Sequence, residues 1–279
     1  MNAGVFLFQD FPCIINAQRH IMYLRRNPQT GADDMTTGRI IRATAAAAAI
    51  VLASARAINA DAAGYGQGTA VDGDNRPSDA VLFDESFGKY DAYATTPDRS
   101  RIIITFDQGY ENGYTADILD TLREKNVKAI FFLTGDYAEK ETELVERMID
   151  EGHMLGNHTM NHESLPELTE QEAIDEVQEL HEYVMDKYGY EMQYFRFPCG
   201  EYSEESLRAV QSLGYKTLFW SYAYQDWQTD AQPEPSAALG KLKSSAHGGE
   251  ILLLHSVSAT NAEILGDAID SFREMGFVL

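Results

Sequence analysis

The sequence predicts an α/β fold, a distorted (β/α) barrel of about seven parallel strands, over residues 98–279 of the 279-residue chain. Seven apolar runs of strand length alternate with six segments of helical spacing, which is typical of a parallel sheet covered by helices. The runs are almost continuously apolar, as expected for parallel strands covered on both faces. An open sheet is the alternative to a barrel. In either arrangement, a functional site is expected at the carboxyl ends of the strands.

The predicted strands follow one another along the chain from residue 101 to its last residue. Their ranges are 101–106, 128–135, 153–157, 193–197, 216–222, 250–255 and 277–279. The predicted helices between them span 115–126, 141–152, 169–189, 203–214, 235–249 and 260–276. Thr169 with Glu172, and Ser203 with Ser206, form capping patterns at the starts of two of these helices. Most of the helices end on glycine, which suits a left-handed cap and marks the boundary.

The chain is strongly acidic. It carries 44 acidic and 22 basic side chains, so its formal net charge is −22. This balance argues against nucleic-acid binding and against membrane contact through a polybasic patch. It indicates no particular protein partner. The two cysteines, Cys13 and Cys199, are too few for a disulfide framework.

Residues 1–62 are expected to be an upstream extension followed by a secretory signal, with Met35 as the candidate true start. Two arginines precede an alanine-rich apolar run at 43–53, and small residues that suit cleavage follow, ending at Ala62. The protein is therefore expected to be exported. An uncleaved membrane anchor and an alanine-rich tail without a signal are the alternatives. Residues 63–97, rich in Gly, Asp, Ser and Pro, are interpreted as a linker or lead-in.

Polar and reactive side chains follow five of the predicted strands, at the point where each strand ends. In chain order they are Asp107, then His158 and His162, then Arg196, then Asp226 with Trp227, and finally His255. The predicted helices, by contrast, carry ordinary surface charge. Because the carboxyl ends of parallel strands meet at one edge, these side chains are expected to converge on one site.

His158 and His162 are four residues apart, which places two imidazoles on one face of a helical turn and suits a metal ion. A pair of surface histidines is the ordinary alternative. The carboxylate of Asp107 at another strand end makes the metal site the better interpretation. Zn²⁺ is the natural ion for two imidazoles and an oxygen ligand, with other divalent ions as alternatives.

Asp107 is predicted to be a catalytic carboxylate, held ionised and oriented by a bidentate pair with Arg196. The alternatives are a helix cap for Asp107 and a structural ion pair for Arg196. His255 is predicted to be a general acid, because Asp226 would set the tautomer of its imidazole and raise its pKa. A core histidine with satisfied hydrogen bonds is the alternative for His255.

The segments TFDQG, HTMNH, RFPCG, DW and LLLH, in this order, resemble the polysaccharide deacetylase family, the NodB-homology domain of carbohydrate esterase family 4. The resemblance covers roughly residues 101–277. The segments TFDQGYENGYT, GNHTMNHESL and LLLHSVSATNAE are most similar to the delta-lactam-biosynthetic de-N-acetylases. This resemblance implies a metal-dependent hydrolase that removes N-acetyl groups from peptidoglycan, chiefly from N-acetylmuramic acid, in muramic delta-lactam formation for the spore cortex. The expected partner is the peptidoglycan glycan strand, at the cell wall or spore envelope.

The resemblance also implies roles for the side chains at the strand ends. Asp107 would be the general base, tethered by Arg196, and His158 and His162 would bind the metal. Gln108 departs from the family, most of which has a second aspartate there as a metal ligand. A neutral amide oxygen is a weaker ligand than a carboxylate, so a looser metal site is expected. The delta-lactam group itself commonly has an amide at this position.

The remaining roles implied by the resemblance concern the oxyanion and the leaving group. The backbone N–H of Cys199 would help to stabilise the oxyanion, and Trp227 would form a wall of the pocket. His255 would protonate the departing amine, with Asp226 tuning it. These parts suit amide hydrolysis, in which water must be activated and the nitrogen must leave protonated.

Three other functions remain as alternatives at this point. The first is deacetylation of N-acetylglucosamine, in peptidoglycan or chitooligosaccharides. The second is glycoside hydrolysis by paired carboxylates, which leaves the histidine pair unexplained. The third is a glycan-binding protein with weakened catalysis, an alternative that Gln108 motivates.

Overall fold

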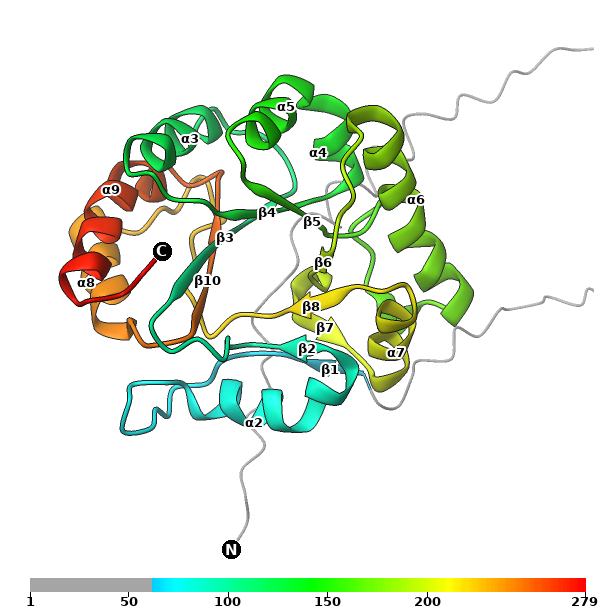
Figure 1. Cartoon of the computed structure of the whole chain (residues 1–279), viewed down its shortest axis with the longest axis horizontal. Helices are drawn as coiled ribbons and strands as arrows, with labels where there is room; N and C mark the ends of the chain where they lie inside the picture. Colours follow the sequence, from blue (N-terminus) through cyan, green and yellow to red (C-terminus); the bar gives the residue numbers. More distant parts are fainter. Residues whose placement is uncertain (1–61) are drawn as a thin grey trace, which may run out of the picture.

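The structure is a computed structural model that describes residues 62–279. The expected secretory signal and the candidate start Met35 lie outside these residues. No helix within 62–279 is long and apolar enough to cross a membrane. The described chain forms a curled inner sheet with helices around its outer side (Figure 1).

A parallel sheet of eight strands forms the inner layer of residues 62–279. Its order is β2 (Ala92–Tyr93), β8 (Lys216–Leu218), β6 (Tyr194–Phe195), β5 (Met154–Asn157), β4 (Ile130–Leu133), β3 (Ile102–Gln108), β10 (Glu250–His255) and β9 (Tyr222–Ala223). All neighbouring strands are parallel. The sheet curls, but β2 and β9 remain its two ends. The predicted α/β fold with a distorted parallel barrel is confirmed, in the form of an incomplete barrel.

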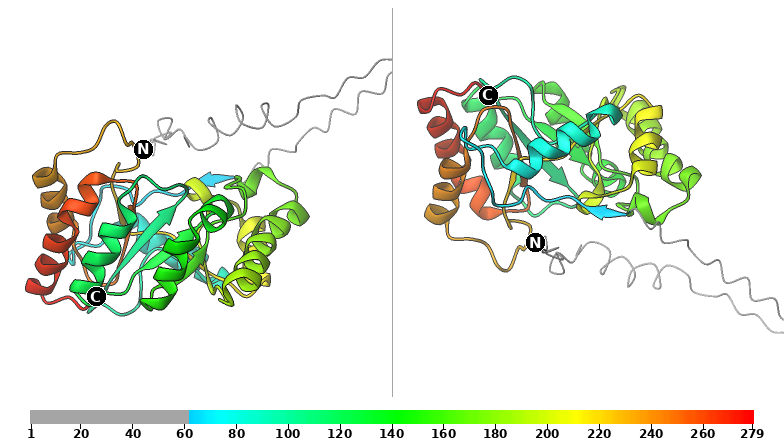
Figure 2. Two further views of the ribbon diagram at one scale, coloured as in Figure 1. Left: turned by 90° about the horizontal axis from the view of Figure 1, so that it is seen from above. Right: turned by 90° about the horizontal axis from the view of Figure 1, so that it is seen from below.

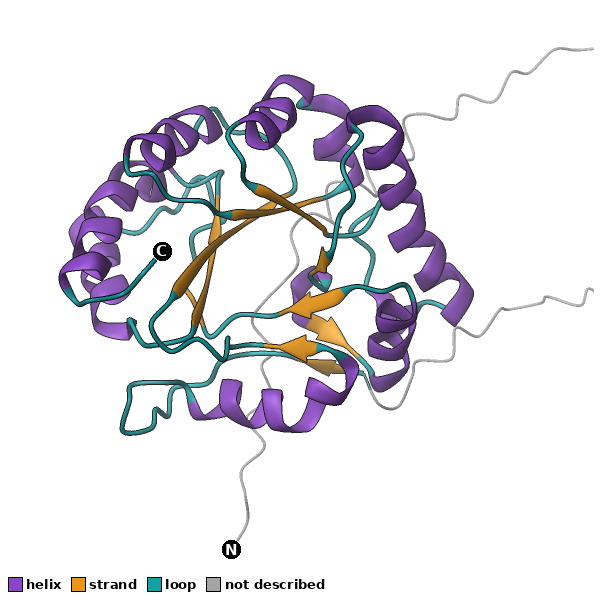
Figure 3. Cartoon of the chain, viewed as in Figure 1, coloured by secondary structure: helices purple, strands orange, loops and turns teal. Residues whose placement is uncertain are grey.

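The outer layer consists of helices that connect the strands (Figure 3). They are α2 (Ser78–Phe87), α3 (Thr115–Glu124), α4 (Gly135–Lys140), α5 (Thr142–Asp150), α6 (Glu170–Tyr188), α7 (Glu204–Ser212), α8 (Pro235–Ser245) and α9 (Ala259–Glu274). Both predicted capping patterns are present, Thr169 with Glu172 at α6 and Ser203 with Ser206 at α7. Gly189 ends α6 in the left-handed conformation, as predicted.

Two features of the predicted sheet were wrong. The apolar end 277–279 is no strand, and Val278 makes only an isolated bridge to Arg101 just before β3. The single predicted run at 216–222 divides into β8 and β9, separated by residues that lie outside any strand. Strands of two or three residues carry too short an alternation for their ends to be read from the sequence.

The segment 63–97 is a packed lead-in rather than a linker. Its first strand, β1 (Ala63–Gly64), pairs antiparallel with β7 (Glu201–Tyr202), and its last strand, β2, belongs to the main sheet. Between them α2 crosses the side of the domain next to β2 (Figure 2). The ring of Tyr65 packs against Phe219 and edge-on against Trp220, with ring centroids 4.8 and 5.2 Å apart, so aromatic contacts anchor this segment to the rest of the fold.

A buried polar cluster lies at the amino end of β10. Glu250 is fully buried, and its Oε2 accepts the backbone N–H of His247 at 3.1 Å. Within the described residues its other oxygen, Oε1, has no hydrogen-bond partner. The His247 Nε2 atom lies 2.8 Å from Ser221 Oγ. Burial raises the pKa of Glu250 to about 8, against the opposing effect of the His247 N–H, so this carboxyl is protonated at neutral pH.

Glu250→Gln is expected to stabilise the protein increasingly as the pH rises from about 5 to about 8. A carboxyl whose pKa is higher in the folded state binds a proton on folding. Its contribution to the free energy of unfolding is therefore complete below the ordinary pKa of glutamate. Between that pKa and the raised pKa of the folded state, the contribution declines by about 1.4 kcal/mol per pH unit. Glutamine does not titrate, so the variant escapes this decline. Thermal unfolding across the range tests the prediction, with exposed Glu263→Gln on α9 as the matched control. A Tm difference that stays constant with pH contradicts it.

Candidate active site

The register of the sheet brings the predicted side chains to one edge. Asp107, near the end of β3, pairs with His255, the last residue of β10. Asn157, the last residue of β5, pairs with Phe195 of β6. The residues that directly follow these two strands are His158 and Arg196, so both side chains come from the same edge as Asp107.

Asp107 is almost completely buried and is held by Arg196. The Arg196 Nη1 atom donates to Asp107 Oδ1 at 2.8 Å and to Thr105 Oγ1 at 2.9 Å. Its remaining donors bind the carbonyls of Leu218 and Phe219, so the predicted bidentate pair is wrong. Burial alone would raise the pKa of Asp107. The positive charge of Arg196, with a smaller effect of the neighbouring histidines, instead holds that pKa below its ordinary value.

The two histidines of the predicted metal site lie together, with ring centroids 4.9 Å apart. The His158 Nδ1 atom donates to the backbone carbonyl of Arg196 at 2.8 Å, so its Nε2 keeps a lone pair for a ligand. This Nε2 lies 3.6 Å from Asp107 Oδ2. The expected helical turn is wrong, because residues 158–162 form a loop in which Thr159 and His162 adopt left-handed backbone angles. That loop, rather than helical spacing, brings the rings together.

Gln108 is also buried at this edge. Its Nε2 donates to Ser256 Oγ at 2.5 Å, and within residues 62–279 its Oε1 has no hydrogen-bond partner. A buried amide oxygen without a donor fits a site that takes a cation, because such oxygens are otherwise satisfied. The described residues contain no cluster of three or more His, Cys, Asp and Glu suited to a metal. Two imidazoles with centroids 4.9 Å apart and the unsatisfied oxygen of Gln108 nevertheless fit a divalent ion bound through the imidazoles, with oxygen ligands weaker than a carboxylate.

His255 and Asp226 form a close pair. The His255 Nδ1 and Asp226 Oδ1 atoms are 2.7 Å apart, and the His255 backbone N–H donates to Asp226 Oδ2 at 2.8 Å. The Asp226 side chain is fully buried, whereas 24% of the His255 side chain is exposed. Burial would lower the pKa of His255. Asp226, with a smaller effect of Asp107, instead raises that pKa above its ordinary value. The Trp227 ring lies 5.7 Å from the imidazole, centroid to centroid.

Cys199 lies in a tight turn, four residues after the end of β6. The turn η3 (Pro198–Gly200) has Cys199 at φ 56° and Gly200 at φ 67°, both left-handed. A Cβ on Gly200 would approach the ring of Trp220 to 2.8 Å, so only glycine fits this position. The turn places Cys199 at the surface, three residues beyond Arg196.

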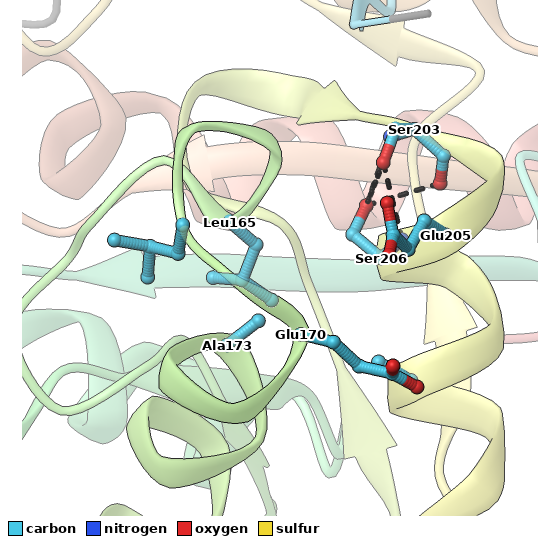
Figure 4. A pocket seen from close by; sticks show the side chains of 8 residues that line it. Leu165, Glu170, Ala173, Ser203, Glu205 and Ser206 are labelled. Atoms are coloured by element: carbon cyan, nitrogen blue, oxygen red, sulfur yellow. Dashed lines mark hydrogen bonds between the residues drawn. The ribbon is translucent and has the colours of Figure 1, made fainter. Parts of the chain in front are cut away.

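Two cavities lie away from these side chains. The first is a crevice of about 10 Å³ between α6, α7 and the short turn η2 (Leu165–Glu167), where Ser203 and Ser206 bind each other (Figure 4). It is barely large enough for one water molecule. The second holds about 290 Å³ at the amino ends of β3, β4 and β5, beside Arg101 and Lys128. Neither cavity is lined by a residue of the candidate site.

The sequence prediction missed three polar residues at the site. Ser256 contacts Gln108, while Gln232 and Asn261 contact Asp226. Serine, glutamine and asparagine are ordinary in loops and helix starts, so their types give no signal. Only Asn261 could have been found from the sequence, through its position in the helix. It shares a face of α9 with the buried residues Ile264, Leu265 and Ala268, where a polar side chain needs a partner.

Comparisons with known proteins agree with this geometry. Residues 94–218 match the family model for polysaccharide deacetylase. The peptidoglycan-N-acetylmuramic acid deacetylase PdaA of Bacillus subtilis is 41% identical over 191 residues, which cover 68% of this chain and 73% of PdaA. A peptidoglycan-N-acetylglucosamine deacetylase of Bacillus cereus is 32% identical over 180 residues, 64% of each chain. The solved structure of Bacillus subtilis PdaA, a family 4 carbohydrate esterase, superposes with a TM-score of 0.74 at 36% identity, over 78% of this chain and 94% of PdaA. The protein therefore belongs to the polysaccharide deacetylase family.

Proposed function

We propose that this protein is a metal-dependent hydrolase that removes the N-acetyl group from peptidoglycan amino sugars, with N-acetylmuramic acid as the preferred substrate. One observation carries the proposal. Asp107 and His255 face each other in register on adjacent strands, and their surroundings move their pKa values in opposite directions. A carboxylate with a lowered pKa next to an imidazole with a raised pKa suits the general base and the general acid that amide hydrolysis needs. The likeness to PdaA supports the choice of sugar.

In this proposal Asp107 is the general base. Its carboxylate, oriented by Arg196, accepts a proton from water as the water oxygen bonds to the acetamide carbonyl carbon. The backbone N–H of Cys199 would donate to the carbonyl oxygen as negative charge develops there. A divalent cation, with Zn²⁺ favoured, would be held by His158 and His162 and would supply Lewis acidity to the water and the carbonyl.

His255 is the general acid of the proposal. Its Nδ1 is engaged by Asp226, so its Nε2 carries the proton that can be transferred. That proton goes to the sugar nitrogen as the C–N bond breaks, and acetate and a free amine are released. Trp227 stands beside the imidazole and would form a wall of the pocket. Export to the cell wall or spore envelope completes the proposal, supported by the signal pattern in residues 1–62.

Acetate release tests this function. The chain from Ala63 onward is assayed on peptidoglycan strands stripped of their peptides and on an N-acetylglucosamine oligomer, with added Zn²⁺ and with chelator. Metal-dependent acetate from the stripped strands is the expected result. Acetate from the oligomer alone would move the substrate to N-acetylglucosamine, in line with the Bacillus cereus relative. Bound glycan without acetate would favour a glycan-binding protein.

Ionic strength should separate the two substrates further. The chain has a net charge of −22, and muramic acid residues carry lactyl carboxylates, so protein and strand repel each other at low salt. Raising NaCl from about 20 to about 200 mM shortens the Debye length roughly threefold and should raise kcat/KM on the stripped strands. The neutral oligomer serves as the matched control, with little expected change. Equal salt responses of both substrates would contradict this prediction.

A further inference from the structure

The carboxylate of Asp226 lies on a loop and needs support from elsewhere in the fold. Two of its hydrogen bonds come from His255, the residue that it orients. The third comes from the side chain of Asn261 on α9, whose Nδ2 donates to Asp226 Oδ2 at 2.6 Å. Asn261 is thus a hydrogen-bond donor to this carboxylate that is independent of His255.

Asn261 is itself held in place. It is 1% exposed, and its backbone N–H donates to Ser258 Oγ at 3.0 Å in the first turn of α9. The second proton of its Nδ2 reaches the carbonyl of His255 at 3.1 Å. Its Oδ1 accepts the hydroxyl of Tyr224. Because a carboxylate only accepts and the tyrosine donates, both partners fix the same orientation of the amide.

A second amide ties the loop to the same helix start. The Gln232 Nε2 donates to the backbone carbonyl of Asp226 at 2.8 Å. The Gln232 Oε1 accepts the hydroxyl of Ser258, the cap of α9, at 2.5 Å. Gln232 therefore holds the main chain of Asp226, while Asn261 holds its carboxylate. Hydrogen-bond networks of this kind restrict rotamers when every member is satisfied.

We propose that Asn261 is a positioning residue for deacetylation, because its amide holds the Asp226 carboxylate against the His255 imidazole. Through this contact, helix α9 fixes the orientation of the proton donor His255. The inference rests on the proposed function, because it takes His255 as the general acid. Asn261 meets the reaction only through Asp226. A small misorientation of a catalytic group is enough to slow the chemical step.

Three variants, made in the chain from Ala63 to Leu279, test the proposal. Asn261→Leu removes the donor, and Asn261→Asp keeps the shape but sets a second carboxylate beside Asp226. Tyr224→Phe leaves the amide in place and only frees its orientation. For the first two we expect kcat on stripped strands to fall about 10- to 100-fold with KM within about twofold. A smaller fall is expected for Tyr224→Phe. Exposed Asp267→Asn on the same helix is the control and should match the parent.

A measurement without substrate separates this proposal from the proposed function. The proton on His255 Nδ1, bonded to Asp226, should give a downfield proton NMR resonance, assigned by its loss in His255→Gln. We expect this resonance to weaken or disappear in Asn261→Leu. An unchanged resonance or an unchanged kcat in that variant overturns the proposal. A parent protein that releases no acetate, yet loses the resonance in Asn261→Leu, keeps the positioning role and rejects the deacetylase function.

Discussion

Asp107→Asn is expected to lower kcat for acetate release by about 10²- to 10⁴-fold, the range that a general base contributes. The amide cannot take the proton of the attacking water. Its oxygen can still accept the Arg196 Nη1 bond that Asp107 Oδ1 accepts at 2.8 Å, so the domain should remain folded. Acetate release on stripped strands and thermal unfolding are measured together, because the prediction is a loss of activity that exceeds any loss of folded protein.

The control for this variant is Asp117→Asn, an exposed residue on α3 that should leave both measurements unchanged. Zn²⁺ binding, followed by calorimetry, should be retained in Asp107→Asn, because the proposed ligands are His158 and His162. A variant that keeps more than about a tenth of the parent activity would remove Asp107 from the role of base. A variant that loses activity only because it unfolds would leave the parent and the variant equal per folded molecule, which also contradicts the prediction.

The sequence was informative about this edge of the sheet because strand ends are local features. The long apolar runs that became β3 and β10 stop at Asp107 and His255, and parallel pairing alone brings such ends together. Neither end required knowledge of distant contacts. The short strand β2 was missed, and β9 was not separated from β8, for the opposite reason. Two residues carry no periodicity, and such a strand is defined by the neighbours with which it pairs.

The loop and the hydrogen bonds that hold the site residues in place could not be predicted from the sequence, for a related reason. Helical spacing predicted that the rings of His158 and His162 lie together, which they do, but it predicted the wrong backbone, since Thr159 and His162 adopt left-handed angles. Tertiary contacts hold that loop; for example, the backbone N–H and the side-chain amide of Asn161 both donate to the carboxylate of Glu176. Asn261 reaches Asp226 across 35 residues of chain. Hydrogen bonds between residues so far apart in the sequence follow no sequence pattern, so they can be identified only when the fold is known.

Arg196→Met is expected to have the largest effect on stability, a loss of about 3–5 kcal/mol, together with loss of activity. Arg196 is completely buried, and its guanidinium donates to four oxygens, including one of the Asp107 carboxylate. It also lies over the Phe132 ring, 4.2 Å from the ring centroid. Removing the guanidinium leaves Asp107 as a buried charge without its main counter-ion. The pKa of Asp107 should then rise, because burial raises it and the strongest opposing charge is gone. Urea unfolding at neutral pH measures the loss.

The double variant Arg196→Met with Asp107→Leu separates the pair's effect on stability from its effect on catalysis. Taking away both charges removes the unpaired carboxylate, so the double variant should be more stable than Arg196→Met alone, although it carries one more substitution. The carbonyls of Leu218 and Phe219 lose their donor in both variants, so full recovery is not expected. Activity should stay absent, because no base remains. Asp107→Leu alone is measured as well. If the losses of Arg196→Met and Asp107→Leu add up to the loss of the double variant, Asp107 and Arg196 do not act as a buried pair, and the low pKa of the proposed base needs another cause.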